Sequence, residues 1–162
     1  MQRRLRHSLP ALAHASSNLD CVAAARALEQ LAGLGPGLTP SGDDFIVGYL
    51  AAVHSRCSRE PLLRPFLDGL FAPLSRLAAA ANLISRQFLL NALDGEFSES
   101  LAQLVFAVQA DDEPWLRDSA SRLVRVGHSS GADSLVGVLF GLQPSLVLAR
   151  APAPRRAVAD LT

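Results

Sequence analysis

The hydrophobic pattern of the chain is helical, and one segment is apolar on nearly every side. Apolar residues fill almost every position between Phe45 and Val53, and a helix that is apolar all round normally lies at the centre of its domain. Elsewhere apolar residues recur every three or four positions, and no segment shows the sustained two-residue alternation of a half-buried strand. The pattern therefore predicts an all-α fold, a single helical domain of about six to eight helices.

Capping residues, glycine and proline mark where these helices begin and end. Ser17 or Asn18 is a candidate N-cap. Gly33 is placed to end the helix that follows, because glycine adopts the left-handed backbone that helix ends often require. Pro61 opens a further helical stretch. The predicted helices cover about residues 17–32, 42–56, 75–93, 98–110, 112–126 and 131–142.

A Gly-rich loop followed by an apolar helix occurs twice. The first copy is G-L-G-P-G-L-T-P-S-G-D-D-F-I-V-G-Y-L (residues 33–50), and the second is G-H-S-S-G-A-D-S-L-V-G-V-L-F-G-L (residues 127–142). At a constant offset of 89 residues (from 41 to 130), Asp44 matches Asp133 and Gly48 matches Gly137. Glycine lowers helix propensity by about 1 kcal/mol relative to alanine. Gly48 and Gly137 therefore predict a close approach of the two helix backbones.

Composition and charge narrow the class of protein. A chain of 162 residues, of which 49 % are apolar, has the size and composition of one ordered domain. Fifteen basic and fifteen acidic residues give no formal net charge, whereas sequence-independent nucleic-acid binding needs a basic excess. No apolar run approaches the length of a membrane span. Cys21 and Cys57 are too few and too isolated for a disulfide framework or a zinc site, so we expect free thiols in a reducing cytoplasm.

The two ends of the chain differ from its middle. Residues 1–15 start with a basic stretch, and their apolar positions are too interrupted for a signal peptide. We expect them to form a weakly ordered lead. Residues 16–149 are the predicted helical domain, and residues 150–162, rich in Ala, Pro and Arg, are the predicted disordered tail.

The first Gly-rich loop has features of an anion-binding site. A helix N-terminus presents unpaired N–H groups and the positive end of the helix dipole. Gly35, Gly37 and Gly42 would let a ligand approach the backbone closely, and Thr39 and Ser41 would add hydroxyl groups. The loop is not a phosphate-binding P-loop, because no lysine follows the glycines. A phosphate, carboxylate or carbamoyl group fits this design; the alternative is a turn that only begins a helix.

The carboxylates after the loop have two interpretations. Ser41 with Asp44, and Ser130 with Asp133, show the spacing of a capping box, which predicts a structural role for both aspartates. Asp43 has no counterpart in the second copy. Together with Asp44 it is a candidate for holding Mg²⁺ or orienting a polar substrate, or else a partner of the helix dipole. Mg²⁺ is the one candidate cofactor.

The second motif contains residues with catalytic potential. Its G-H-S-S-G segment fits the nucleophile elbow of α/β-hydrolases, but that triad needs a later histidine and none follows His128. His128 is a candidate donor or general acid–base group. Ser129, Ser130 and Gly131 are candidate ligand-binding residues beside it.

A third polar segment lies between the two copies. On a continuous helix, Asn82, Ser85 and Arg86 share one face, and Asn91 follows further along. This face either lines the same pocket, with Arg86 as an anion clamp, or is a solvated surface.

Three segments together resemble a known family. They are G-L-G-P-G-L-T-P-S-G-D-D-F, N-L-I-S-R-Q-F-L-L-N-A-L-D-G-E and the final G-H-S-S-G-A-D-S-L-V-G-V-L-F-G-L, in that order over about residues 30–143. The set resembles the AllH-like family, long catalogued as a domain of unknown function, whose named member is a subunit of bacterial oxamate carbamoyltransferase in ureide catabolism. The chain is similar to the C-terminal part of that family's architecture. The family's middle motif commonly has threonine where Ala81 and Asn82 stand.

The resemblance implies a multi-subunit enzyme that moves a carbamoyl group between oxamate and phosphate. Its partners would be other carbamoyltransferase subunits and a small anionic substrate, and association of identical copies remains an option. In this hypothesis the first loop binds the substrate, Asp43 and Asp44 orient it or a metal, and His128, Ser130 and Asp133 complete the pocket. The two alternatives are a non-catalytic structural subunit and a Mg²⁺-dependent hydrolase that uses helical aspartates.

Overall fold

The computed structural model describes residues 2–143, with side chains from residue 4, and this part of the chain is entirely helical. It contains eight helices and no strand: α1 (Gln2–Ser17), α2 (Cys21–Leu31), α3 (Ser41–Arg56), α4 (Leu63–Ala80), α5 (Leu83–Leu93), α6 (Glu99–Ala110), α7 (Glu113–Val124) and α8 (Ser130–Gly141). The all-α prediction is confirmed. The predicted tail, residues 150–162, lies outside the described residues.

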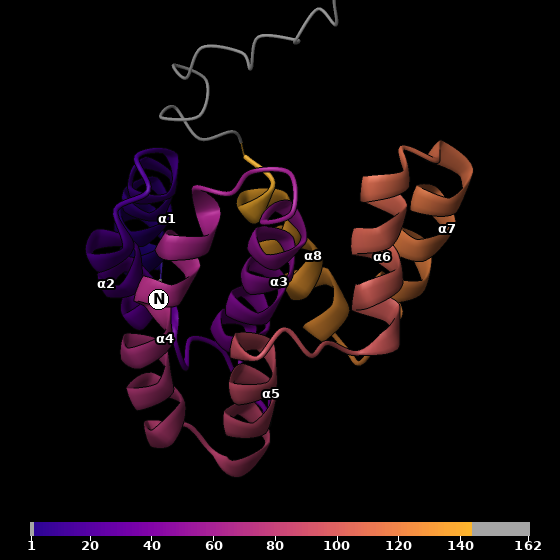
Figure 1. Cartoon of the computed structure of the whole chain (residues 1–162). Helices are drawn as coiled ribbons and strands as arrows, with labels where there is room; N and C mark the ends of the chain where they lie inside the picture. Colours follow the sequence, from indigo (N-terminus) through magenta and orange to yellow (C-terminus); the bar gives the residue numbers. More distant parts are fainter. Residues whose placement is uncertain (1, 144–162) are drawn as a thin grey trace, which may run out of the picture.

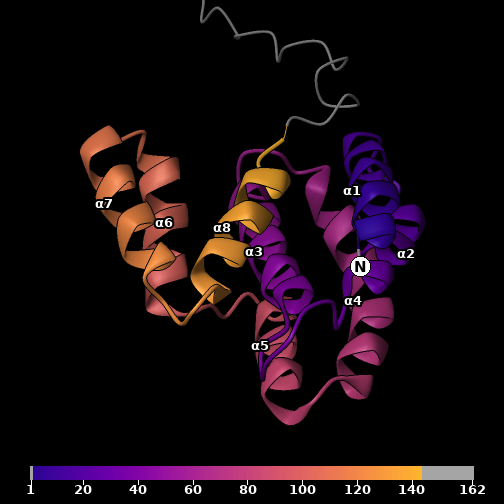
Figure 2. The ribbon, with the colours of Figure 1, turned by 180° about the vertical axis from the view of Figure 1, so that it is seen from behind.

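Helices α3 and α8, which follow the two Gly-rich loops, lie side by side at the centre of the molecule (Figure 1). The α1–α2 hairpin and α4 lie on one side of this pair, and the α6–α7 hairpin lies on the other, while α5 packs against α3 and α4. Figure 2 shows the same arrangement from behind. No helix within residues 2–143 is long and apolar enough to cross a membrane.

The two central helices meet through their glycines. A Cβ atom added at Gly48 would overlap the backbone carbonyl of Ser134, and one added at Gly137 would overlap that of Phe45. Phe45 and Ser134 are themselves related by the 89-residue offset, so the contact is nearly symmetric. The predicted close approach of the two backbones is confirmed.

Helix α3 is buried because it belongs to both hydrophobic clusters of the domain. Ile46, Tyr49 and Leu50 pack with α1, α2, α4 and α5 and are at most 1 % exposed. Ala51 and Ala52 pack with α6, α7 and α8. The apolar run therefore marks the central helix, as its composition predicts.

The basic N-terminal segment is helical in the structure and not a weakly ordered lead. Leu5, Leu9 and Leu12 are spaced by one helical turn, and Leu12 and Ala15 are buried in the larger core cluster. Pro10 inside this helix and the surrounding basic residues obscure the amphipathic pattern in the sequence. The following helix is capped by Asp20, whose side chain accepts the N–H of Ala23, and not by Ser17 or Asn18.

The predicted helix over residues 75–93 is wrong, because the chain breaks into two helices at Asn82. The backbone of Asn82 is extended, and its side chain accepts the N–H groups of Ile84 and Ser85. This is a favourable N-cap arrangement. Asn82, Ser85 and Arg86 therefore do not share one continuous helix face. Gly33, in contrast, follows α2 with a φ of +68°, as predicted for a left-handed helix stop.

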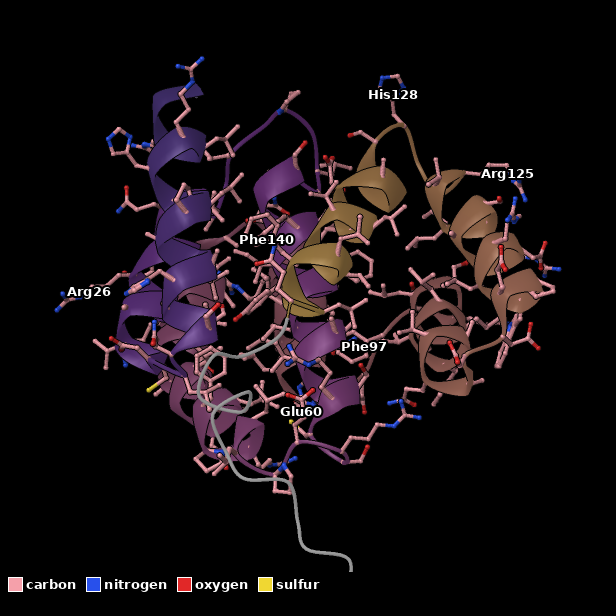
Figure 3. All side chains as sticks on the ribbon, turned by 90° about the horizontal axis from the view of Figure 1, so that it is seen from above. Arg26, Glu60, Phe97, Arg125, His128 and Phe140 are labelled. Carbon is pink, nitrogen blue, oxygen red and sulfur yellow. The ribbon has the colours of Figure 1, made fainter. Side chains whose placement is uncertain are left out.

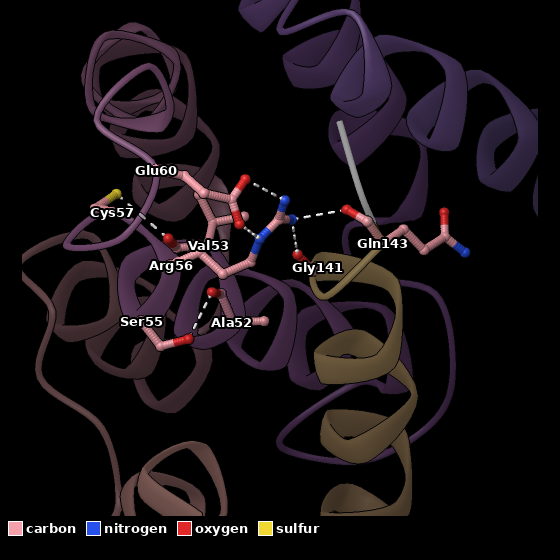
Figure 4. Close-up of polar contacts among 8 residues, drawn as sticks. All are labelled: Ala52, Val53, Ser55, Arg56, Cys57, Glu60, Gly141 and Gln143. Atoms are coloured by element: carbon pink, nitrogen blue, oxygen red, sulfur yellow. Dashed lines mark hydrogen bonds and ion pairs between the residues drawn. The ribbon is translucent and has the colours of Figure 1, made fainter. Parts of the chain in front are cut away.

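Arg56, at the end of α3, ties the two central helices together. Its guanidinium donates to the carbonyls of Gly141 (2.7 Å), the last residue of α8, and of Gln143 (2.8 Å), which follows α8. It also forms a bidentate ion pair with Glu60 (Figure 4). The side chain is only 13 % exposed. One cation thus satisfies carbonyl groups that a helix C-terminus leaves unpaired.

We expect Arg56→Ala to lower the free energy of unfolding by about 2–3 kcal/mol, because it leaves two carbonyls and a partly buried carboxylate without their donor. Urea unfolding followed by circular dichroism measures this. Arg117→Ala is the control, since Arg117 and Glu113 form a pair with both side chains 79 % exposed, and it should cost less than about 1 kcal/mol. Equal losses for the two variants would show that Arg56 does not join α3 to α8.

Candidate functional site

A cavity of about 460 Å³ lies where the two Gly-rich motifs meet the start of α6. It is bounded by the beginnings of α3 and α8, the last turns of α5 and α7, and the segment that joins α5 to α6. Its lining residues are Thr39, Asp44, Val47, Phe88, Asn91, Glu96, Phe97, Ser98, Leu101, Leu123, Val126, Gly127, Ser130, Gly131 and Ser134. It combines carboxylates, hydroxyls and an amide with apolar walls, which is the usual make-up of a small-molecule site.

Hydrogen bonds bring the three sequence motifs together beside this cavity. The hydroxyl oxygens of Thr39 and Ser130 are 2.9 Å apart, which links the first loop to the second across 91 residues. Ser85, in the middle motif, donates to the carbonyl oxygen of Leu38 at 3.3 Å. The predicted convergence of the first and second motifs is therefore seen, and the middle motif adds Phe88, Asn91 and Glu96 to the cavity lining.

Asp44 is the chemically unusual residue of the cavity. It is 9 % exposed, and its Oδ2 atom has no hydrogen-bond partner within the described residues. Burial raises the pKa of Asp44, an effect that the hydroxyls of Ser130 and Thr39 partly offset and that the nearby Asp133 carboxylate reinforces. A buried acceptor without a donor is costly, so this oxygen is suited to a ligand that brings an N–H or O–H group.

Asp133, the counterpart of Asp44 in α8, also has a buried Oδ2 atom without a partner in this part of the chain. It lies close enough to raise the pKa of Asp44. The internal repeat thus places two equivalent carboxylates near each other at the contact of α3 and α8.

Neither aspartate caps its helix, so the capping-box prediction is wrong. Helix α3 begins at Ser41, and helix α8 begins at Ser130; neither has a side-chain cap hydrogen bond. Both serines lie inside the first turn, one position too late to act as N-cap. Ser130 instead faces Thr39, which explains the serine and leaves Asp44 and Asp133 unexplained by capping.

Three of the N–H groups that an anion could use at the start of α3 are already paired. Gly42 donates to the carbonyl of Leu34 at 2.8 Å, and Asp43 and Asp44 donate to that of Pro40 at 2.8 and 3.1 Å. A Cβ atom at Gly42 would overlap the carbonyl of Leu31. Gly42 is therefore explained by close packing against the end of α2. The N–H groups at this position are hydrogen-bonded to carbonyl groups of the loop itself.

Asp43 faces away from the cavity that Asp44 lines. Its Oδ1 atom accepts the N–H of Gly33 at 2.8 Å, and the side chain is 4 % exposed. It borders a separate hollow with Arg76 and Asn82. The structure does not bring Asp43 and Asp44 together in one cavity, and Asp43 has a structural role as the anchor of the first loop.

We expect Asp43→Ala to lower the free energy of unfolding by about 1–3 kcal/mol, because the N–H of Gly33 loses its acceptor. Thermal and urea unfolding measure this. Asp43→Asn is the matched control, since its amide oxygen keeps an acceptor at the same place, and it should recover most of the lost stability. An alanine variant as stable as the wild type would contradict the anchoring role.

The remaining predicted site residues lie outside the cavity. His128 and Ser129 are exposed, and Figure 3 shows His128 at the periphery of the molecule. Arg86 donates to the carbonyl of Ala79 at the end of α4. Asn82 caps α5. The other two glycines of the loop, Gly35 and Gly37, have φ values of +111° and +102° and shape the turn, and Ser41 packs against Gly35.

Sequence reasoning missed the segment that joins α5 to α6. Glu96, Phe97 and Ser98 line the cavity although no motif spacing connects them to the Gly-rich loops. The available signal was their position at the end of the middle motif, whose last residue is Glu96, in the turn G-E-F-S. Phe88 and Ser134 were missed for a different reason, because both look like ordinary helix-face residues.

A family described as oxamate carbamoyltransferase subunit AllH matches residues 31–142. This range begins at the last residue of α2, ends just after α8 and includes every residue that lines the cavity. No solved structure matches the chain.

Proposed function

Because the chain belongs to the AllH family of oxamate carbamoyltransferase subunits, we propose that it takes part in carbamoyl transfer between oxamate and phosphate. We further propose that the cavity between the two Gly-rich motifs holds the carbamoyl or amide end of the substrate. The observation that carries this proposal is the buried, unpartnered Oδ2 atom of Asp44.

The polar groups of the cavity include both an acceptor for the N–H groups of an amide and donors for its carbonyl oxygen. A carbamoyl nitrogen carries two N–H donors, and the free oxygen of Asp44 accepts one of them. The carbonyl oxygen of the same group needs a donor, and the Asn91 amide or the Ser134 hydroxyl can supply it. The hydroxyls of Thr39 and Ser130 already interact with each other and with Asp44. A hydrogen bond to a charged acceptor is worth about 1.5–3 kcal/mol, enough to fix the orientation of a small ligand.

The negative charge of the cavity determines the orientation in which an anionic substrate binds. Among its lining residues are the carboxylates of Asp44 and Glu96 and no lysine or arginine. Two like charges about 4 Å apart repel by about 4 kcal/mol at an effective dielectric constant of 20. Oxamate therefore binds with its amide end inward, beside Asp44, and its carboxylate outward.

Mg²⁺ remains a proposed cofactor at this carboxylate. Mg²⁺ usually takes one or two protein carboxylates and keeps several waters, and Asp44 with Glu96 could provide the protein ligands. Asp43, the other predicted ligand, anchors the loop and borders a different hollow. Bound there, the metal would take the place of the substrate N–H at Asp44 and would supply positive charge next to the phosphate or carboxylate of the substrate.

Calorimetry of the subunit assembled with its partner subunits tests the proposal. Oxamate, carbamoyl phosphate and inorganic phosphate are titrated with and without Mg²⁺. We expect oxamate to bind the wild-type assembly and to bind at least about tenfold more weakly when Asp44 is replaced by alanine. Unchanged oxamate affinity in a folded Asp44→Ala assembly would move the substrate site elsewhere.

A further inference from the structure

Exposed apolar side chains gather at the mouth of the cavity. Phe88 and Val126 both line it, yet they are 47 % and 42 % exposed. Ile84 lies one helical turn before Phe88, and Leu38 lies beside this turn because its carbonyl accepts from Ser85. Leu38 is 69 % exposed and Ile84 is 39 % exposed. We name Leu38, Ile84, Phe88 and Val126 the apolar rim.

Helix α5 supports this rim with a second apolar face. Its other face is in the core, where Leu89 and Leu93 are 1 % and 6 % exposed. A helix that is apolar on both sides is normally covered on both sides. Contiguous exposed apolar residues next to a polar cavity are typical of a protein interaction site.

The cavity inside the rim needs a positive charge that its own lining does not supply. Asp44 and Glu96 are acidic, and no lysine or arginine lines the cavity. Glu96 is exposed, and its carboxylate forms no ion pair within the described residues. An apolar rim around an acidic mouth is complementary to an apolar anchor next to a basic side chain.

We propose that another subunit of the transferase docks on the apolar rim and places an arginine or lysine at the mouth of the cavity, between Glu96 and the outward end of the substrate. The role of this cation in holding the substrate rests on the proposed function; the docking surface does not. The active site is then shared between two different chains, with the carbamoyl end in this one and the charge-neutralising group in its partner.

Site-specific photo-crosslinking tests the docking surface. Residue 84 is replaced by benzoylphenylalanine in the full chain, which is assembled with the other transferase subunits and irradiated. We expect a crosslink to a peptide of a different subunit that contains arginine or lysine. The same probe at Val22, which is 59 % exposed on α2, serves as the control and should give no crosslink to that peptide. A crosslink to a second copy of this chain, to a peptide without a basic residue, or to nothing would overturn the proposal.

A matched pair of charge substitutions separates this proposal from the proposed function. Ile84→Asp should weaken assembly at least about tenfold, as expected for an interface anchor, while Val22→Asp should leave it unchanged; size-exclusion chromatography with light scattering measures both. Equal assembly of the two variants overturns the docking surface, even if oxamate still depends on Asp44. Loss of assembly by Ile84→Asp supports it, even if oxamate binding proves independent of Asp44.

Discussion

Replacing Asp44 with asparagine is expected to lower carbamoyl transfer by the assembled enzyme about tenfold while making this subunit more stable. The loss of activity follows because a hydrogen bond to a carboxylate is worth about 1.5–3 kcal/mol and one to a neutral amide oxygen about 0.5–1.5 kcal/mol. The difference of about 1–1.5 kcal/mol corresponds to about tenfold in rate. The gain in stability follows because burial disfavours the charged carboxylate. Opposite effects on activity and stability are typical of a functional site.

The stability gain has a defined dependence on pH. The pKa of Asp44 is raised above its usual value of 3.8 in the folded protein, so the folded state holds its proton to a higher pH than the unfolded state. The contribution of Asp44 to stability is therefore present below pH 3.8 and is lost as pH rises through the raised pKa. The Asp44→Asn variant does not lose this contribution. The difference in the free energy of unfolding between the variant and the wild type should therefore grow as pH rises from 3.8 through the raised pKa of Asp44, and should stay constant at higher pH.

Asp43→Asn is the matched control for this experiment. It changes the adjacent carboxylate of the same helix turn, which anchors Gly33 and does not line the cavity. We expect it to keep transfer activity within about twofold of the wild type, because its amide oxygen still accepts the N–H of Gly33 and the lost charge lies outside the cavity. Full activity of Asp44→Asn would instead support a purely structural subunit. Loss of activity in Asp43→Asn alone would show that Asp43, and not Asp44, belongs to the functional site.

Gly48→Ala is expected to destabilise the domain by about 3 kcal/mol or more. The added Cβ atom would lie below 3.0 Å from three backbone atoms of Ser134, and backbone atoms cannot rotate away as a side chain can. Helices α3 and α8 would have to move apart, which disturbs the cavity as well as the core. Overpacking of this kind typically costs about 1–3 kcal/mol and occasionally more, a large share of the 5–15 kcal/mol that stabilises a typical domain.

Gly69→Ala, in α4, is the control for the loss of a helical glycine. Its Cβ atom would also come closer than 3.0 Å to another residue, but the nearer of the two atoms is Sγ of Cys21, which can adopt another rotamer. The other is the Cβ atom of Cys21 at 2.9 Å, which needs only a small shift. The gain in helix propensity, about 1 kcal/mol, offsets part of the cost. Urea unfolding of both variants should show a much larger loss for Gly48→Ala; equal losses would mean that the helix contact is not as close as described.

The sequence predicts the centre of the fold well because repetition and composition both point to it. The apolar run from Phe45 to Val53 and the paired glycines Gly48 and Gly137 are explained by one structural fact, the close packing of α3 on α8. These signals are local and periodic, so they can be read without knowledge of the tertiary structure.

The two aspartates could not be assigned from sequence because they are neighbours on a helix. One residue step turns a side chain by about 100°, which is enough to direct Asp43 to the loop and Asp44 to the cavity. The sequence indicates two carboxylates after a Gly-rich loop, and only the packing of the neighbouring helices distinguishes their roles. Asp43, which the sequence leaves as the carboxylate without a structural explanation, is the one that packing explains most fully.

Other parts of the site depend on contacts between distant segments. Glu96 and Phe97, in the link between α5 and α6, line the cavity together with residues from the starts of α3 and α8, and no pattern within that link predicts this. Asn82 illustrates a competition between two local signals. The residues on either side of Asn82 have a continuous helical periodicity, but Asn82 acts as an N-cap and begins a new helix there.

A structure of the assembled transferase with oxamate bound tests the central claim most directly. The account predicts oxamate in the cavity between the two Gly-rich motifs, with its amide nitrogen about 3 Å from the Oδ2 atom of Asp44 and its carboxylate toward the mouth. Oxamate bound wholly within another subunit, while Asp44 keeps no contact with it, would contradict the account.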